Sequence, residues 1–265
     1  MFTTAPYLGN PVAVVLGADG IDDEDMRQFA NWTNLSETTF VLAPEAEGAD
    51  YRVRIFTPSS ELPFAGHPTL GTCHAWLEAG GRPAGDGVIV QECPAGLIPL
   101  RQSETGLAFA APPLVRSGPV DDKDVERVVR SLNIDRSDIV DIAWADNGPG
   151  WVAVLLASAD AVLALEPGRV EGDIGVAGLY PPGSPEALEV RAFFGPVSTE
   201  DPVTGSLNAS LAQWLTSTGR LTAPYVACQG TALGRRGRVT ITQDPDGQIW
   251  VGGGTVTCIT GTVAL

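Results

Sequence analysis

Residues 61–67 read ELPFAGH, and residues 200–206 read EDPVTGS. The two segments share Glu, Pro and Gly at one offset of 139 residues, from 61 to 200, from 63 to 202 and from 66 to 205. Each segment follows a strand-like stretch and precedes a long apolar stretch typical of a buried helix. Self-similarity at a fixed offset indicates a repeated structural unit. The sequence therefore predicts two related units of strand, turn and helix.

The two copies are separated by a cluster of Pro and Gly at residues 111–119 (APPLVRSGP), which lies ahead of an acidic helix start. Boundaries between domains commonly fall in such stretches. We expect an N-terminal domain of residues 1–113 and a C-terminal domain of residues 114–265, and the pattern leaves open whether the last strand returns to the first domain. Two related domains usually face each other around a pseudo-twofold axis, so their interface is the expected ligand site.

Alternating or apolar runs bounded by Gly, Pro and Asp recur along the chain and predict strands. These runs are residues 12–15, 38–42, 51–56, 88–91, 107–110, 139–144, 151–156, 188–194, 238–242, 249–252 and 256–263. Helical patterns are fewer, at residues 22–32, 69–79, 121–132 and 207–218. A strand-rich α+β protein follows.

The composition narrows the function classes. Of the 265 residues, 44% are hydrophobic and 18% are charged, which is enough apolar material for a buried core. The net charge of −16 argues against nucleic acid or an anionic membrane as a partner, because both bind through Lys and Arg. There is no apolar run of membrane-spanning length, and the first residues, MFTTAPYLGNP, lack the pattern of a signal peptide. We expect a cytoplasmic protein.

The lysine, histidine and cysteine residues of the sequence give little support for a cofactor or a metal site. Lys123 is the sole lysine and lies in an acidic helix start, so it is poorly suited to a pyridoxal Schiff base or to a phosphate-binding loop. His67 and His74 are the two histidines, and with Cys73 they make a partial zinc set whose spacing matches no usual pattern. We expect neither a metal nor an organic cofactor.

The glycines of the repeat predict an anion site. Gly66 and Gly205 each precede a predicted helix, whose first N–H groups have no backbone partner and attract carboxylates. A residue without Cβ also lets a ligand approach those amides closely. The alternative is that the following residues, His67 and Ser206, are simple helix caps. The duplication favours ligand contact in both copies.

Glu37 is the candidate proton carrier. It lies in residues 34–40 (NLSETTF), between a predicted helix and the start of an apolar strand. A carboxylate flanked by Leu35 and Phe40 can be partly desolvated, which suits a group that moves protons at neutral pH. Spacing alone leaves open the alternative of a solvated turn.

Five segments together resemble one known family. They are residues 9–15 (GNPVAVV), 35–40 (LSETTF), 54–58 (RIFTP), 61–69 (ELPFAGHPT) and 200–206 (EDPVTGS). In this order, and over nearly the whole chain, they resemble the PhzF-like family of phenazine-biosynthesis isomerases. The resemblance implies the diaminopimelate-epimerase-like α+β fold, with two pseudo-symmetric domains, each a β-sheet or barrel wrapped around a central helix. It also implies a homodimer.

The same resemblance implies roles for particular residues. In that family a Glu that matches Glu37 moves a proton between carbons of a dihydro-hydroxyanthranilate. The substrate-binding positions match Gly66, His67, Asp201, Gly205 and Ser206. His and Asp would orient polar groups of the substrate, while the helix start with its Ser would hold a carboxylate. We therefore expect a cofactor-independent isomerase acting on a small anionic substrate.

Three other functions compete with this one. In a two-base racemase of the same fold the paired cysteines would fall at Ala65 and Thr204, and neither residue can take a proton from carbon. A hydrolase could assemble Ser206, His67 and Asp201, although the sequence has no nucleophile elbow. A protein that binds the ligand without catalysis is the third alternative.

Overall fold

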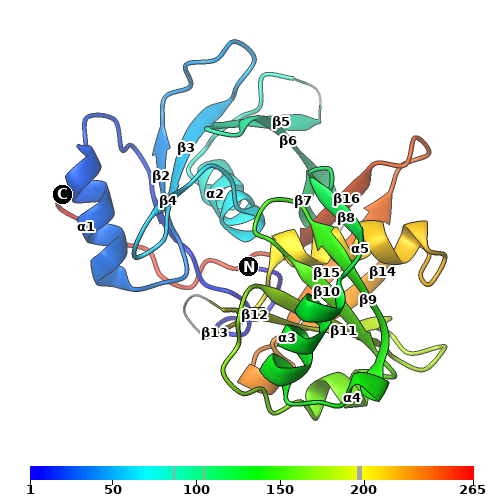
Figure 1. Ribbon diagram of the computed structural model, residues 1–265. Helices are drawn as coiled ribbons and strands as arrows, with labels where there is room; N and C mark the ends of the chain where they lie inside the picture. The colour runs from blue at the N-terminus through cyan, green and yellow to red at the C-terminus, as the bar shows by residue number, and fades with distance from the viewer. Residues whose placement is uncertain (86, 104, 196–198) are drawn as a thin grey trace. The chain divides into compact units, whose positions relative to one another are not determined.

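The computed structural model describes residues 1–85, 87–103, 105–195 and 199–265, which form two compact units (Figure 1). The first unit contains Met1–Ala110 and Gly252–Leu265, and the second contains Ala111–Val251. The expected division after residue 113 lies within three residues of this boundary. The C-terminal residues, Gly252–Leu265, group with the first unit.

The first unit is a curved sheet with two helices. Its elements are β1 (Ala13–Val15), α1 (Asp23–Thr33), β2 (Thr38–Leu42), β3 (Tyr51–Phe56), β4 (Glu61–Leu62), α2 (Gly66–Glu78), β5 (Val88–Cys93), β6 (Gly96–Ser103) and β7 (Gly106–Ala110). The strands follow the order β1-β2-β3-β5-β6-β7, and β4 pairs with β3. Helix α2 packs against β1, β2 and β7. Since β1 and β7 stand at opposite ends of this order, the sheet wraps around α2.

The second unit repeats this plan with additions at its start. Its elements are β8 (Arg116–Pro119), α3 (Asp122–Leu132), β9 (Ile139–Asp146), β10 (Val152–Leu156), α4 (Ala159–Leu163), β11 (Ile174–Leu179), β12 (Leu188–Phe194), β13 (Thr199–Asp201), α5 (Gly205–Ser217), β14 (Tyr225–Gln229), β15 (Gly237–Gln243) and β16 (Ile249–Gly253). The strand order is β16-β15-β14-β12-β11-β10-β9-β8, with β13 beside β12. Helix α5 packs against β9 and β15.

The pairing directions show that the units are topological duplicates. β1 is parallel to β2 and β10 to β11, each pair with a helix between its strands in the chain. β2 is antiparallel to β3 and β11 to β12. β3 is parallel to β5 and β12 to β14, with α2 and α5 in the respective connections. The internal repeat predicted from residues 61–67 and 200–206 is therefore a repeat of the whole unit.

The two central helices are buried because their sequences have no polar face. Residues 66–73 of α2 are all buried, and so are most residues of α5. A helix that is apolar or small on every side has to lie inside a protein. By contrast, α3 buries a stripe that includes Val125, Val128 and Leu132 and turns its charged residues outward.

Both central helices begin earlier than the sequence pattern predicts. The expected starts were residues 69 and 207, whereas the helices begin at Gly66 and Gly205. His67 and Ser206 are therefore second residues of their helices, and the N-caps are Ala65 and Thr204. The alternative in which His67 and Ser206 are caps is wrong.

The sequence prediction lacks six of the strands: β4, β6, β8, β11, β13 and β14. β11 carries Gly175 and Gly178, and glycine lowers strand propensity. A Cβ on Gly175 would lie 2.1 Å from the Leu207 side chain on α5, and one on Gly178 would lie 2.2 Å from the Ser158 carbonyl oxygen. These glycines therefore let helices pack closely on the strand. This close packing involves residues distant in the chain, so the sequence of the strand itself does not predict it.

The strand expected at residues 256–263 is wrong. No strand is assigned there in the described chain, and residues 257–265 are exposed, with Ile259 87% accessible. β-branched residues favour a strand, but a strand also needs a neighbour to complete its hydrogen bonds. This segment instead contacts α2 through Thr257, whose hydroxyl donates to Glu78 at 2.5 Å.

Candidate active site

Glu37 and His67 come together within the first unit. Glu37 immediately precedes β2, and its carbonyl accepts the Ala13 N–H of β1 at 3.4 Å. His67 is the second residue of α2. Glu37 Oε2 lies 3.1 Å from His67 Nε2, with the side chains 15% and 5% exposed respectively. Two residues that the sequence separates by a strand pair and a turn thus form one buried contact.

His67 is a neutral imidazole in this environment. Burial lowers the pKa of His67 to about 3, because an imidazolium loses its hydration there. The contact with Glu37 is therefore not an ion pair at neutral pH, although its distance falls in that range. On the other side of the ring, Nδ1 lies 3.5 Å from Asn10 Nδ2, and Asn10 is fully buried.

A buried polar network holds α2 against the sheet that carries Glu37. The Thr72 hydroxyl donates to Thr39 Oγ1 at 2.8 Å, and Thr39 lies two residues after Glu37 on β2. From β5, Gln91 Nε2 donates to Thr69 Oγ1 at 2.9 Å. Buried polar groups with satisfied partners define one arrangement of a core. The first turn of α2 therefore keeps a defined position beside Glu37.

The second unit holds Asp201 and the start of α5 in a comparable network. The Thr204 hydroxyl donates to Asp201 Oδ2 at 2.5 Å. Gln229 on β14 accepts the Thr204 N–H through Oε1 at 2.9 Å and donates from Nε2 to the Asp201 carbonyl at 3.1 Å. Asp201 ends β13, and Ser206 follows Thr204 by two residues. Asp201 and the helix start are thus joined through Thr204.

The family assignment rests on the match of the whole chain. Residues 1–261 match the family described as "Phenazine biosynthesis-like protein", PhzC-PhzF. The chain belongs to this family. "Trans-2,3-dihydro-3-hydroxyanthranilate isomerase" of Pseudomonas fluorescens is 35% identical over 244 residues, covering 88% of this chain and 84% of its own. "Antisense-enhancing sequence 1" of Schizosaccharomyces pombe is 34% identical over 283 residues, covering 98% and 95%.

A solved structure has the same fold as this PhzC-PhzF protein. The crystal structure of the Bacillus anthracis phenazine biosynthesis protein, PhzF family, superposes with a TM-score of 0.79 at 26% identity and covers 94% of this chain and 92% of its own. The resemblance identified from five sequence segments and the diaminopimelate-epimerase-like α+β fold that it implies are both confirmed.

The central helices of this PhzC-PhzF protein, α2 and α5, differ from its other α-helices in how their N-termini are capped. Asp22, Asp121 and Ser158 accept N–H groups at the starts of α1, α3 and α4. Ala65 and Thr204, which precede α2 and α5, form no side-chain cap bond. N–H groups of an uncapped first turn suit an anion.

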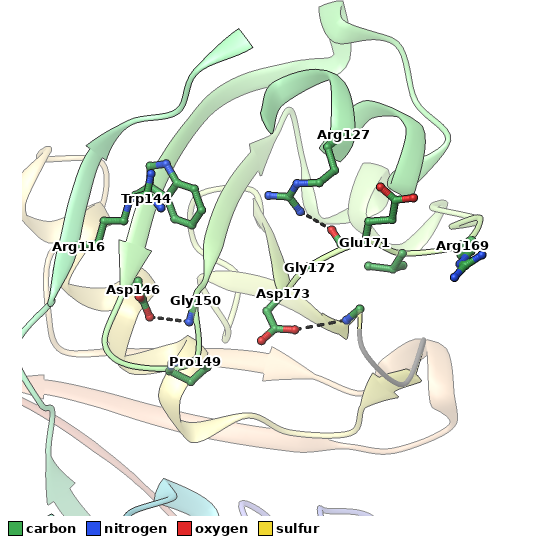
Figure 2. Close-up of a pocket in the computed structure, with 12 residues that line it drawn as sticks. Arg116, Arg127, Trp144, Asp146, Pro149, Gly150, Arg169, Glu171, Gly172 and Asp173 are labelled. Carbon is green, nitrogen blue, oxygen red and sulfur yellow. Dashed lines mark hydrogen bonds between the residues drawn. The ribbon is translucent and has the colours of Figure 1, made fainter. Parts of the chain in front are cut away.

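A groove in the second unit does not contain the predicted site residues. It has a volume of about 540 Å³, and Figure 2 shows the residues around it. They are Arg116, Arg127, Trp144, Asp146, Pro149, Gly150, Arg169, Val170, Glu171, Gly172, Asp173 and Gly195. The Arg116 guanidinium lies 3.3 Å from the centre of the Trp144 ring, and Arg127 pairs with Asp124 at 3.0 Å. Several of its charged groups are thus already engaged within the protein.

Sequence reasoning missed the residues that hold Ser206. Trp151 Nε1 donates to Ser206 Oγ at 3.2 Å, and Asn147 Nδ2 donates to the Ser206 carbonyl at 2.9 Å. The turn between β9 and β10 carries both residues, and its Asn-Gly-Pro-Gly sequence signals a turn without indicating what the turn contacts.

The described residues contain neither a membrane-spanning helix nor a metal-binding cluster. No helix among them has the length and apolar character that a membrane crossing requires. No set of three His, Cys, Asp or Glu side chains among them is placed to hold a metal ion. Of the partial zinc set suggested by the sequence, Cys73 is buried, and His74 contacts Glu78 at 3.2 Å.

Proposed function

We propose that this protein is a cofactor-independent isomerase that moves a proton between carbons of a small cyclic substrate bearing a carboxylate, a dihydro-hydroxyanthranilate or a related compound. The observation that carries the proposal is the buried contact between Glu37 and His67 at 3.1 Å. A Pseudomonas fluorescens relative named for dihydro-hydroxyanthranilate isomerisation supports the substrate class. Glu37 is the proposed acid and base.

The proposed reaction needs one carboxyl group that works in both directions. The Glu37 carboxylate takes a proton from a substrate carbon while the electron pair moves into the conjugated system. The resulting carboxylic acid then returns the proton to another carbon, so that no proton or electron is gained or lost overall. His67 stays neutral, as its lowered pKa requires, and orients Glu37 or a polar group of the substrate.

The remaining site residues are proposed to bind the substrate. The uncapped first turns of α2 and α5, at Gly66 and Gly205, offer N–H groups to an anion. Ser206 adds a hydroxyl at the second of these turns. Asp201, held by Thr204 at 2.5 Å, presents a fixed carboxyl group for a polar substituent such as an amine.

The rival functions fit these residues less well. A hydrolase needs His67 as a base for the Ser206 hydroxyl, but an imidazole with a pKa of about 3 is too weak a base at neutral pH. A two-base racemase needs proton carriers at Ala65 and Thr204, where the structure has a methyl group and a hydroxyl that donates to Asp201.

We further propose that the protein is a cytoplasmic homodimer without nucleic-acid or membrane partners, as its acidic composition and its family resemblance suggest. Sedimentation analysis at micromolar concentration tests the dimer. A single species of 27.7 kDa would contradict it.

Glu37→Gln tests the central proposal. Gln keeps the shape of the side chain but cannot carry the proton, so we expect turnover of dihydro-hydroxyanthranilate to fall about a thousandfold, within the ~10² to 10⁴ range of acid–base catalysis. Glu47→Gln, at an exposed position in the same unit, is the control and should retain wild-type turnover. In ordinary water a substrate deuterated at the donor carbon should keep part of its label. Near-normal turnover by Glu37→Gln would refute the proposal.

A further inference from the structure

Trp151 occupies a position that controls the Ser206 hydroxyl. It is fully buried in the turn immediately before β10, and its ring packs edge-on against Phe194 with the ring centres 4.9 Å apart. From this fixed position the indole N–H reaches Ser206 Oγ at 3.2 Å. Trp151 and Ser206 are 55 residues apart in the chain, so the bond depends on packing within the second unit.

The direction of this hydrogen bond is unambiguous. An indole N–H donates and cannot accept, so Ser206 Oγ must be the acceptor. A hydroxyl that accepts one bond still has its own proton to donate, in a direction away from the donor that it has accepted. Within the described residues of the second unit, Ser206 Oγ has no hydrogen-bond partner besides the indole. Its proton is therefore available to a ligand.

The turn that carries Trp151 is built to keep its shape. Asp146 Oδ1 accepts the N–H groups of Gly148 and Gly150, both at 2.7 Å, and Figure 2 shows the second of these bonds. Gly148 and Gly150 have positive φ angles of 138° and 102°, which favour glycine. From the same turn, Asn147 holds the Ser206 carbonyl at 2.9 Å. Ser206 is thus held at both its backbone and its side chain.

We propose that Trp151 is a positioning residue for substrate binding, which turns the Ser206 hydroxyl proton toward the substrate carboxylate at the start of α5. This inference rests on the proposed function, since it assigns the carboxylate to Ser206. Trp151 acts through Ser206 and does not touch the substrate. Removing the indole N–H should therefore weaken carboxylate binding only while the Ser206 hydroxyl is present.

Calorimetric titration with two ring compounds tests the inference. The first probe is 3-hydroxyanthranilate, a flat and stable analogue that keeps the carboxylate, and the second is 2-aminophenol, the same ring without it. We expect Trp151→Phe to weaken 3-hydroxyanthranilate binding about tenfold, the equivalent of one hydrogen bond to a charged group, with little change for 2-aminophenol. In a Ser206→Ala background, Trp151→Phe should have no further effect.

Trp144→Phe is the matched control, because Trp144 lies on β9, the strand that leads into the turn of Trp151, and has its ring against Arg116 rather than Ser206. It should leave the affinity for 3-hydroxyanthranilate unchanged. Equal weakening of both probes by Trp151→Phe, or the same loss with and without the Ser206 hydroxyl, would mean a purely structural role and overturn the inference. Unchanged 3-hydroxyanthranilate binding by Trp151→Phe would overturn it as well.

A second measurement leaves Trp151 intact, in case Trp151→Phe does not fold. The chain has six Trp residues, so its nitrogen–proton NMR spectrum should contain six indole signals. One of them should move upfield in Ser206→Ala, and in the wild type that signal should also shift when 3-hydroxyanthranilate binds. If no indole signal responds to Ser206→Ala, the inference is wrong.

These binding experiments separate the inference from the proposed reaction. Suppose that Trp151→Phe weakens 3-hydroxyanthranilate binding only while the Ser206 hydroxyl is present, and that Glu37→Gln has normal turnover. This result would refute the proposed reaction and support the role of Trp151. If Trp151→Phe binds 3-hydroxyanthranilate as the wild type does and Glu37→Gln is inactive, the role of Trp151 is refuted and the proposed reaction is supported. If 3-hydroxyanthranilate does not bind the wild-type protein at all, both the substrate class and the inference are overturned.

Discussion

The first copy of the repeat runs from β3 through β4 to α2, and the second runs from β12 through β13 to α5. The two copies share a scaffold and differ in the side chains that are proposed to act on the substrate. Arg54 on β3 forms two bonds to Glu61, both 2.8 Å, and Arg191 on β12 forms two to Glu200, at 3.0 and 2.7 Å. In each copy the guanidinium also lies 5.0 Å from the ring of the Phe two residues later. The Arg and Glu of the repeat therefore anchor the turn to its strand and take no part in the proposed reaction.

The shared scaffold extends to the central helices. A fully buried Gln from the strand after each helix bonds to a helix residue: Gln91 to Thr69 at 2.9 Å, and Gln229 to Asn208 at 2.8 Å. Both helices have 13 residues, and both lack a side-chain cap. The second helix residue differs, since it is the buried His67 in one copy and the partly exposed Ser206 in the other.

The acid before the second strand differs as well. Glu37 precedes β2, and Asp173 precedes β11. The Glu37 carbonyl accepts an N–H from β1, and the Asp173 carbonyl accepts one from the equivalent strand, β10. Glu37 faces His67, whereas Asp173 accepts the Gly195 N–H at 3.3 Å and lines the groove of Figure 2. Burial raises the pKa of Asp173 above its usual value. Duplication thus supplied two acidic positions, and we propose that one became the proton carrier.

The largest expected effect comes from comparing these two acids. Glu37→Gln should lower turnover about a thousandfold, and Asp173→Asn should change it less than about threefold, because Asp173 has no imidazole partner and belongs to a different groove. Steady-state kinetics on both variants measures the ratio. A comparable loss in Asp173→Asn would show that the two copies have not diverged in the way proposed.

The next largest effect concerns the Arg–Glu ion pair of each copy, Arg191 with Glu200 and Arg54 with Glu61. The side chains of Arg191 and Glu200 are 7% and 10% exposed, against 20% and 26% for Arg54 and Glu61. Arg191→Met leaves a buried carboxylate without its partner and should lower the free energy of unfolding by about 3 kcal/mol. Arg54→Met is the matched control and should cost less, because water screens Glu61. Urea denaturation followed by circular dichroism compares them, and equal losses would contradict this ranking.

The buried imidazole should make stability depend on pH. The folded-state pKa of His67 is about 3, below its usual value of 6.5, so the unfolded chain binds a proton that the folded chain excludes. Stability is therefore present above pH 6.5 and is lost as the pH falls toward 3, at about 1.4 kcal/mol per unit once the unfolded imidazole is protonated. Urea denaturation at pH 7, 6, 5 and 4 measures the slope.

Two variants isolate this contribution from that of the carboxylates. His67→Gln should have a shallower decline of stability between pH 6 and 4 than the wild-type protein has. His74→Gln removes the less buried histidine of the same helix and is the matched control. An unchanged slope in His67→Gln would mean that His67 is not held neutral by the fold.

The smallest effect tests the uncapped helix start. Ala65 has the extended backbone of an N-cap, with φ −152° and ψ 136°, so Ala65→Ser should cap α2 and stabilise the protein by about 0.5 to 1 kcal/mol. The new hydroxyl would compete for N–H groups proposed to bind substrate, so KM should rise. Asp121→Ala, which removes the cap of α3, should cost about 1 kcal/mol without changing KM. A stabilised Ala65→Ser with unchanged KM would argue against an anion at α2.

The sequence by itself determined the features that depend on residues close together in the chain or on a repeated motif. The offset of 139 residues predicted the duplication, and the apolar stretches after Gly66 and Gly205 predicted the buried helices. Five motifs identified the family, which the match over residues 1–261 confirms. The same motifs predict that Glu37 and His67 belong to one site, and their roles stay predictions.

Tertiary structure alone decided which of these segments meet and how their polar atoms pair. The β-rich pattern at residues 256–263 forms no strand because propensity does not provide a neighbouring strand. Strand β11 forms despite its glycines because they make room for helices α4 and α5. The bond from Trp151 to Ser206 spans 55 residues and depends on the position of a turn against a helix end. Local patterns record burial along the chain, whereas such a bond depends on how distant segments pack.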